Sequence, residues 1–87
     1  MKAALHYVYL LQCADGSLYC GYTTDVDRRL TEHNGVGKIA GARYTSGRRP
    51  VHLIHQESFA TRSEAQKREV EIKKLPRQHK LQLVKRL

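Results

Sequence analysis

Two strand-like runs joined by a tight-turn signal limit the folds open to this chain more than any other feature. Residues 6–12, HYVYLLQ, and residues 17–23, SLYCGYT, are rich in the aromatic, β-branched and apolar residues that favour strands. The CADG segment between them contains Asp15-Gly16, a pair typical of hairpin turns. The sequence therefore predicts an antiparallel β-hairpin.

A short helix is expected directly after the hairpin. Thr24 and Asp27 have the spacing of a capping box, which predicts a helix from about residue 25 to His33. The Asn-Gly pair that follows His33 ends it. Arg29 and His33 lie four residues apart, so both project from one side of this helix.

The rest of the chain predicts a long loop, one strand and two helices. Residues 35–50 are rich in glycine and arginine, and loops of this length are uncommon unless they have a function. Residues 51–57 alternate as a third strand does. The TRSE segment at 61–64 is a second capping box, opening a helix of about a dozen residues that stops at Pro76. Residues 77–87 predict a last, short basic helix.

This order of elements, ββαβαα, predicts an α+β fold in which helices flank a three-stranded antiparallel sheet. With 87 residues, of which 40% are hydrophobic, the chain is expected to form one domain, residues 1–87, with a single modest core. No apolar run approaches the ~20 residues of a membrane span. His6 and Tyr7 interrupt the apolar start, which argues against a signal peptide. We therefore expect a cytoplasmic monomer without membrane contact.

The cations of the chain are unevenly spread. The net charge is +8 with a pI near 9.9, and fifteen of the sixteen lysines and arginines follow residue 27. Such a surface attracts polyanions, which favours a nucleic acid as partner, although acidic membranes or proteins could also bind it.

Cys13 and Cys20 are the two cysteines of the chain. They lack the clustered spacing of a zinc site, and a disulfide is disfavoured in the cytoplasm. We expect them to act as small, half-buried apolar side chains in adjacent strands.

Glu69 is the most informative residue of the second predicted helix. Ala65 and Ile72 define the apolar stripe of that helix, and Glu69 lies between them, near the edge of the stripe. Burying a lone carboxylate is costly, so it is expected to be paired or to bind a metal. Both interpretations stay open, with Arg68, Lys73 or a strand residue as the partner in a salt bridge.

The residues of the first helix and the hairpin also have ordinary interpretations. Arg29 could pair with Asp25 or Glu32 on the helix surface. His33 could be a common residue at the end of a helix, and tyrosines in strands often fill small cores.

Taken together, these segments resemble the GIY-YIG nuclease superfamily. YVY at 7–9, nine residues, and then YCG at 19–21 match the strand pair that names the superfamily. DVDRRLTEHN at 25–34, ARYTSGRRPV at 42–51 and SEAQKREVEIKKL at 63–75 follow in the family's order. The resemblance extends to the C-terminus and is to the small stand-alone GIY-YIG proteins of bacteria.

The resemblance implies metal-dependent cleavage of a phosphodiester bond, usually in DNA, by Tyr9, Tyr19, Arg29, His33 and Glu69. Glu69 would hold one Mg²⁺ or Mn²⁺, and Arg29 would contact the phosphate. Tyr9 would be the general base, with Tyr19 and His33 ordering the water or relaying its proton, and His33 is a rival base. A tyrosine anion at pH 7 costs ~4 kcal/mol, which Arg29, the metal and a protonated His33 are expected to reduce.

Basic residues of the first helix and the loop are expected to contact the nucleic-acid backbone, with one tyrosine that would stack or pack. They are Arg28, Lys38, Arg43, Tyr44, Arg48 and Arg49. For Arg48 and Arg49 the alternative is solvated loop charge.

The leading hypothesis from the sequence is a DNA endonuclease or exonuclease, structure-selective or weakly specific, with a role in DNA repair or processing. Branched, nicked or single-stranded DNA would be its substrate. The first alternative is a catalytically weak or inactive nucleic-acid-binding module. The second is a basic RNA- or ribosome-associated protein, although no RNA-recognition signature of the usual kinds is visible.

Overall fold

The computed structural model describes residues 5–35 and 47–84 of the chain. The strands form one antiparallel sheet in the order β2-β1-β3, with β1 in the centre. The order ββαβαα and the α+β fold are therefore as predicted. In chain order, the elements are β1 (His6–Gln12), β2 (Leu18–Thr23), α1 (Val26–His33), β3 (His52–Phe59), α3 (Arg62–Lys73) and α4 (Arg77–Val84).

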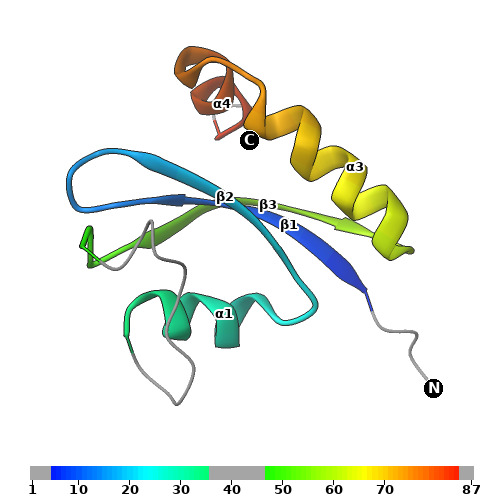
Figure 1. Ribbon diagram of the computed structural model, residues 1–87, viewed down its shortest axis with the longest axis horizontal. Coiled ribbons are helices and arrows are strands. Elements are labelled where there is room, and N and C mark those ends of the chain that lie inside the picture. The colour runs from blue at the N-terminus through cyan, green and yellow to red at the C-terminus, as the bar shows by residue number, and fades with distance from the viewer. Residues whose placement is uncertain (1–4, 36–46, 85–87) are drawn as a thin grey trace.

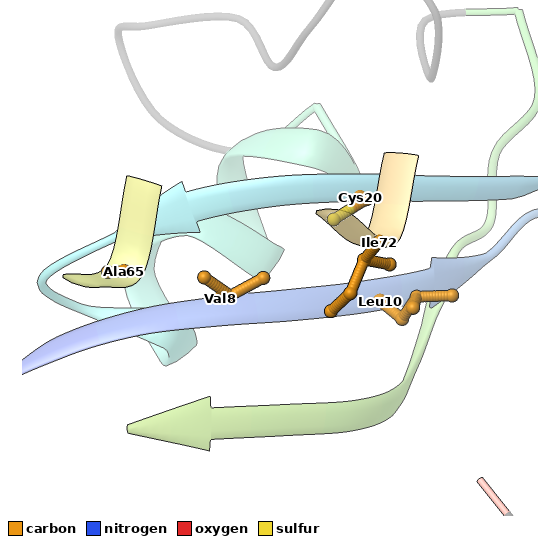
Figure 2. Close-up of a cluster of buried hydrophobic side chains, with 5 residues drawn as sticks. All are labelled: Val8, Leu10, Cys20, Ala65 and Ile72. Atoms are coloured by element: carbon orange, nitrogen blue, oxygen red, sulfur yellow. The ribbon is translucent and has the colours of Figure 1, made fainter. Parts of the chain in front are cut away.

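The sheet lies between two layers of helix (Figure 1), with α1 on one face and α3 and α4 on the other. Successive residues of β1 point to opposite faces, and both faces are covered, so the expected single core is divided into two clusters. The α3 cluster (Figure 2) consists of Val8, Leu10, Cys20, Ala65 and Ile72. The α1 cluster consists of Tyr9, Leu11, Cys13 and Val51, with Leu30 of α1 packed on it.

Cys13 and Cys20 belong to different clusters and therefore lie on opposite faces of the sheet. Both thiols are free and buried. Burial raises the pKa of the Cys20 thiol to about 11. They act as apolar side chains, as expected, but they are buried and not half-buried, and Cys13 lies just after the end of β1.

The hairpin forms with the predicted turn. Gly16 has a φ of 85°, which glycine adopts without strain, and its N–H donates to the carbonyl of Cys13 at 2.9 Å. The Asp15 carboxylate accepts hydrogen bonds from the N–H of Ser17 at 3.0 Å and from Nε of Arg48 at 3.1 Å. Arg48 thereby ties the chain that leads into β3 to the tip of the hairpin.

Helix α1 begins with a different cap from the one expected. Asp25, not Thr24, is the N-cap: its backbone is extended, and its carboxylate accepts from the N–H of Arg28 at 3.1 Å. The capping box of Thr24 and Asp27 was therefore wrong, because a carboxylate one residue later fills the same role. Asn34 caps the other end, and Gly35 follows with a φ of 87°, as predicted.

The cap predicted at Thr61 is confirmed, since its hydroxyl accepts from the N–H of Glu64 at 3.2 Å at the start of α3. The Glu64 carboxylate accepts from the Thr61 hydroxyl at 3.1 Å. Strand β3 continues two residues beyond the predicted end at residue 57, because Ser58 and Phe59 pair with the start of β1. Residues 85–87 of the last predicted helix lie outside the described residues. No helix in the described part of the chain is long and apolar enough to cross a membrane.

Helix α3 is held on the sheet by few apolar residues, because Ala65 and Ile72 are its only fully buried side chains. Arg68 adds a fork of two hydrogen bonds to Glu57 of β3, at 2.8 and 3.1 Å. These bonds lower the pKa of the Glu57 carboxyl. The fork fixes the rotation of α3 about its axis and thus the direction in which Glu69 projects.

Candidate active site

Three rings from three elements meet under α1. The Oη of Tyr9 lies 2.8 Å from Nε2 of His33, at hydrogen-bonding distance. The ring of Tyr19 lies 5.0 Å from that of His33 and 6.4 Å from that of Tyr9 between centroids. Tyr9 is 2% exposed and His33 is fully buried, whereas Tyr19 is half-buried. Tyr9 and His33 thus form an inner pair, and Tyr19 lies nearer to solvent.

The lack of a side chain at Gly21 leaves room for the Tyr9 phenol. The two residues face each other across β1 and β2, and a Cβ at Gly21 would collide with Oη and Cζ of Tyr9. Sequence reasoning did not assign this glycine a function, although a glycine inside a strand is a known sign of close approach by another group.

Arg29 lies between the rings and an open groove. Its Nη1 donates to Oε1 of Glu32 at 2.8 Å, one of the two pairings expected from the sequence. Burial alone would lower the pKa of Arg29, but hydrogen bonds to Glu32 and Tyr9 outweigh it and raise the pKa. The groove has a volume of about 420 Å³ and is lined by Tyr22, Thr23, Thr24, Arg28, Arg29 and Glu32.

The protonation states of the inner pair differ from those expected. Burial, followed by the neighbouring Tyr19, raises the pKa of Tyr9, and Arg29 offsets only part of this. Burial and the charge of Arg29 lower the pKa of His33 to about 4, so the imidazole is neutral at pH 7. Arg29 thus lowers the pKa of Tyr9, as expected, although by less than burial raises it. The expectation that a protonated His33 also eases ionisation of Tyr9 is wrong.

Glu69 lies on the other face of the sheet, beside the edge strand β2. The Sγ of Cys20 is 4.0 Å from the Glu69 carbonyl, which fixes this turn of α3 over β2. The carboxylate is 19% exposed and accepts from Nζ of Lys73 at 2.9 Å, one of the partners named from the sequence. Its charge contributes to the raised pKa of Tyr9, so the carboxylate acts on that phenol across the edge of the sheet.

A metal at this site would depend on Glu69. In the part of the chain that the structure describes, no three His, Cys, Asp or Glu side chains lie close enough to share an ion. One carboxylate fits a hard divalent cation that keeps most of its water and completes its shell with phosphate oxygens. The residues present therefore fit a weakly held Mg²⁺ or Mn²⁺, in competition with Lys73.

The residues expected to contact nucleic acid fall into three groups. Arg28 is exposed, 3.9 Å from Glu32, and points to the groove side of α1. Arg48 pairs with Asp15, and Nε of Arg49 donates to the carbonyl of His33 at 2.8 Å, so both arginines also hold the fold together. Lys38, Arg43 and Tyr44 lie outside the described residues.

Asn34 has a role that the sequence did not predict. Its Oδ1 accepts from the N–H of Val51 at 2.8 Å, and its Nδ2 donates to the carbonyl of the same residue at 3.2 Å. These two bonds join the end of α1 to the residue before β3. A third bond, from Arg49 to the His33 carbonyl, adds to them, and together they hold the backbone of His33 in place. An asparagine after a helix signals a cap, and only the folded chain shows its second partner.

Comparison with known proteins places this chain in one family. Residues 5–82 match the model of the GIY-YIG catalytic domain. A UPF0213 protein of Staphylococcus aureus strain Mu3 is 55% identical over 80 residues, which are 92% of this chain and 94% of that protein.

Two solution NMR structures are similar to the whole fold. UPF0213 protein BH0048 from Bacillus halodurans is 48% identical, with a TM-score of 0.59 over 93% of this chain and 83% of that one. Protein EF2693 from E. faecalis is 54% identical, with a TM-score of 0.62 over the same shares of the two chains.

Proposed function

Because this chain belongs to the GIY-YIG family, we propose that it is a metal-dependent nuclease that hydrolyses phosphodiester bonds in DNA. The observation that carries the proposal is the hydrogen bond between the Tyr9 phenol and the neutral, fully buried His33, beside Arg29. An apolar core gains nothing from an imidazole that must be desolvated and paired. Perturbed titratable groups that converge beside a basic groove are typical of catalytic sites.

We assign activation of the water to the Tyr9–His33 pair. A Tyr9 phenolate is disfavoured because the pKa of the phenol is raised. In the His33 tautomer that carries its proton on Nδ1, Nε2 can take the phenolic proton as Oη takes one from the water. This step has to overcome the lowered pKa of the imidazole, which the charge that develops at the phosphate and metal would offset. No free phenolate then forms, and Tyr19, which is nearer to solvent, orders the water.

The phosphate would be held from both sides of β2. Arg29 uses Nη1 for Glu32, which leaves other donors of its fork for the non-bridging oxygens. Glu69 would hold the divalent ion, Mg²⁺ or Mn²⁺. A bound ion supplies charge neutralisation at the phosphate and the departing oxygen.

We propose branched, nicked or single-stranded DNA as the substrate, in DNA repair or processing, and a monomer in the cytoplasm as the active form. A chain of 87 residues offers little surface for long base-specific contacts, and its charge of +8 favours the backbone. Arg28 would contact that backbone, as would Lys38, Arg43, Tyr44, Arg48 and Arg49.

The test is a cleavage assay on a panel of DNA shapes with and without Mg²⁺, for the wild type and Glu69→Gln. We expect cleavage that chelation abolishes, and a loss of about 10³-fold in rate for Glu69→Gln. Glu71→Gln, on the same helix with a carboxylate 55% exposed, is the matched control and should cleave like the wild type. Full activity in Glu69→Gln would rule out this mechanism.

A nucleic-acid-binding module without turnover is the second candidate. The ion pair between Lys73 and Glu69 favours it, because a carboxylate that a lysine neutralises binds a metal more weakly. It predicts salt-dependent DNA binding and no cleavage with either Mg²⁺ or Mn²⁺. Preference for RNA with indifference to Glu69 would instead indicate an RNA-associated protein.

A further inference from the structure

Lys73 is a cation at the site to which the proposed reaction gives no role. It lies one helical turn after Glu69, and its Nζ is 2.9 Å from Oε2 of that residue. The lysine side chain is 52% exposed and the glutamate side chain 19%. Glu69 is therefore the fixed member of the pair, and Lys73 is the member free to move.

The ammonium of Lys73 also acts on the phenol side of the site. Its charge interacts with Tyr19 and with Cys20, both on the edge strand β2. Lys73 thus lies where α3 meets β2, in contact with Glu69 and near enough to Tyr19 for their charges to interact.

The neighbouring arginines are engaged elsewhere. Arg68 contacts Glu57 at 2.8 Å and Glu71 at 3.3 Å, and Arg29 contacts Glu32 at 2.8 Å. Lys73 is accordingly the cation that balances the Glu69 carboxylate in the described part of the chain.

We propose that Lys73 is a tethered counter-ion that holds Glu69 in the metal-free protein and moves to a DNA phosphate when a divalent ion binds. This inference rests on the proposed function, because it takes Glu69 as the metal ligand. An ammonium and a divalent cation repel each other, so both cannot stay on one carboxylate. Displacement of Lys73 by the ion frees a positive charge for the DNA, and a DNA phosphate that binds Lys73 clears the carboxylate for the ion.

Metal and DNA therefore bind with positive coupling, each raising the affinity for the other by the same factor. A partly exposed ion pair one helical turn apart is weak, worth a factor of about two to five in affinity. Removal of Lys73 also removes the repulsion of the incoming ion. We expect the two effects together to strengthen metal binding to the free protein by about 3- to 10-fold.

Binding of Mn²⁺ to the DNA-free protein, followed by the EPR signal of the free ion, tests the first half. Lys73→Met should bind Mn²⁺ about 3- to 10-fold more tightly than the wild type. Lys74→Met is the matched control, since Lys74 is exposed and makes no ion pair with any described residue. Glu69→Gln should lose the binding. Equal affinity in Lys73→Met and the wild type would overturn the inference.

Binding of a fluorescent DNA oligonucleotide, with and without Ca²⁺, tests the second half. Without a metal, Lys73→Met should bind DNA less than about twofold more weakly than the wild type, because Glu69 holds the lysine and salt screens the unpaired carboxylate that remains. With Ca²⁺, the wild type should bind about threefold more tightly than Lys73→Met. An equal defect in both conditions would overturn the inference.

The variants separate the two proposals. Unchanged Mn²⁺ binding in Glu69→Gln would overturn the metal site of the proposed function, and this inference with it. Loss of binding in Glu69→Gln with no gain in Lys73→Met would overturn the role of Lys73 alone.

Discussion

The two faces of the sheet are formed by the same strands but bury side chains of different chemical types. The face under α3 buries aliphatic side chains, among them Val8, Leu10 and Ile72. The face under α1 buries a phenol and an imidazole, those of Tyr9 and His33. Burial of aliphatic groups stabilises a fold directly, whereas buried polar groups must be hydrogen-bonded merely to offset their desolvation. The α3 face therefore contributes mainly stability, and the α1 face gives up some stability to hold reactive groups.

Glu69 connects the two faces. It belongs to the helix of the stabilising face, where Ile72 and the fork from Arg68 to Glu57 anchor α3. It nevertheless lies beside β2, close enough to influence Tyr9. Substitutions on the two faces should therefore have different consequences.

The largest effect is expected at Arg29 on the α1 face. Arg29→Met should lower the cleavage rate by about 10³-fold, because it removes the charge and the fork that face the phosphate. Arg29→Lys keeps the charge but not the fork and should recover only part of the rate. Since the pair with Glu32 is partly buried, stability should also fall, by about 1–3 kcal/mol in urea unfolding. A fully active Arg29→Met would exclude a role in catalysis.

The next effect is on stability, on the α3 face. Ile72→Ala should lower the free energy of unfolding by about 3 kcal/mol, because the side chain is fully buried. Val70→Ala on the same helix is the control, since Val70 is 51% exposed and should change stability by less than about 0.5 kcal/mol. Urea unfolding measures both, and equal losses would refute the assignment of Ile72 to the core.

Gly21→Ala separates geometry from chemistry on the α1 face. The added methyl group must displace the Tyr9 phenol, and a shift of about 1 Å at a reacting group can lower the rate by about 10²-fold. Gly47→Ala adds the same methyl group in open space and should be neutral in the cleavage assay. Wild-type cleavage by Gly21→Ala would show that the position of Tyr9 is irrelevant.

The smallest effect is a pH dependence that originates at His33. Its pKa is about 4 in the folded state against about 6.5 in the unfolded chain, so the unfolded state binds more protons between these values. The contribution is present above pH 6.5 and is lost as the pH falls towards 4, by about 2 kcal/mol between pH 7 and pH 5. Urea unfolding at the two pH values measures it, and the loss should shrink in His33→Phe. The same loss in that variant would assign it to other groups.

Turns and helix ends that depend on neighbouring residues were mostly predicted correctly from the sequence. The turn at Asp15-Gly16, the cap at Thr61 and the end of α1 depend on neighbouring residues, and all three are observed. The cap at Thr24 failed because Asp25 competes for the same N–H groups.

Features of the site that depend on burial and on contacts between distant segments could not be predicted from the sequence. Alternation along β1 places Tyr9 on a face, but only the packing of α1 shows that the phenol is desolvated and its pKa raised. The partner of Glu69 stayed open because the sequence offered Arg68, Lys73 or a strand residue. In the structure Arg68 is held by Glu57, and Lys73 is the partner. The hydrogen bond between Asn34 and Val51 could not be predicted either, because a long loop separates the two residues in the sequence.

The most direct test is whether an ion held by Glu69 lies beside the phenols on the opposite face. The chain has five tyrosines, whose ring signals in a ¹³C-tyrosine sample can be followed by NMR as Mn²⁺ is added in small amounts. We predict that the rings of Tyr9 and Tyr19 broaden first in the wild type and stay sharp in Glu69→Gln. Unchanged Tyr9 and Tyr19 signals in the wild type, with broadening elsewhere, would contradict a single site shared by the two faces.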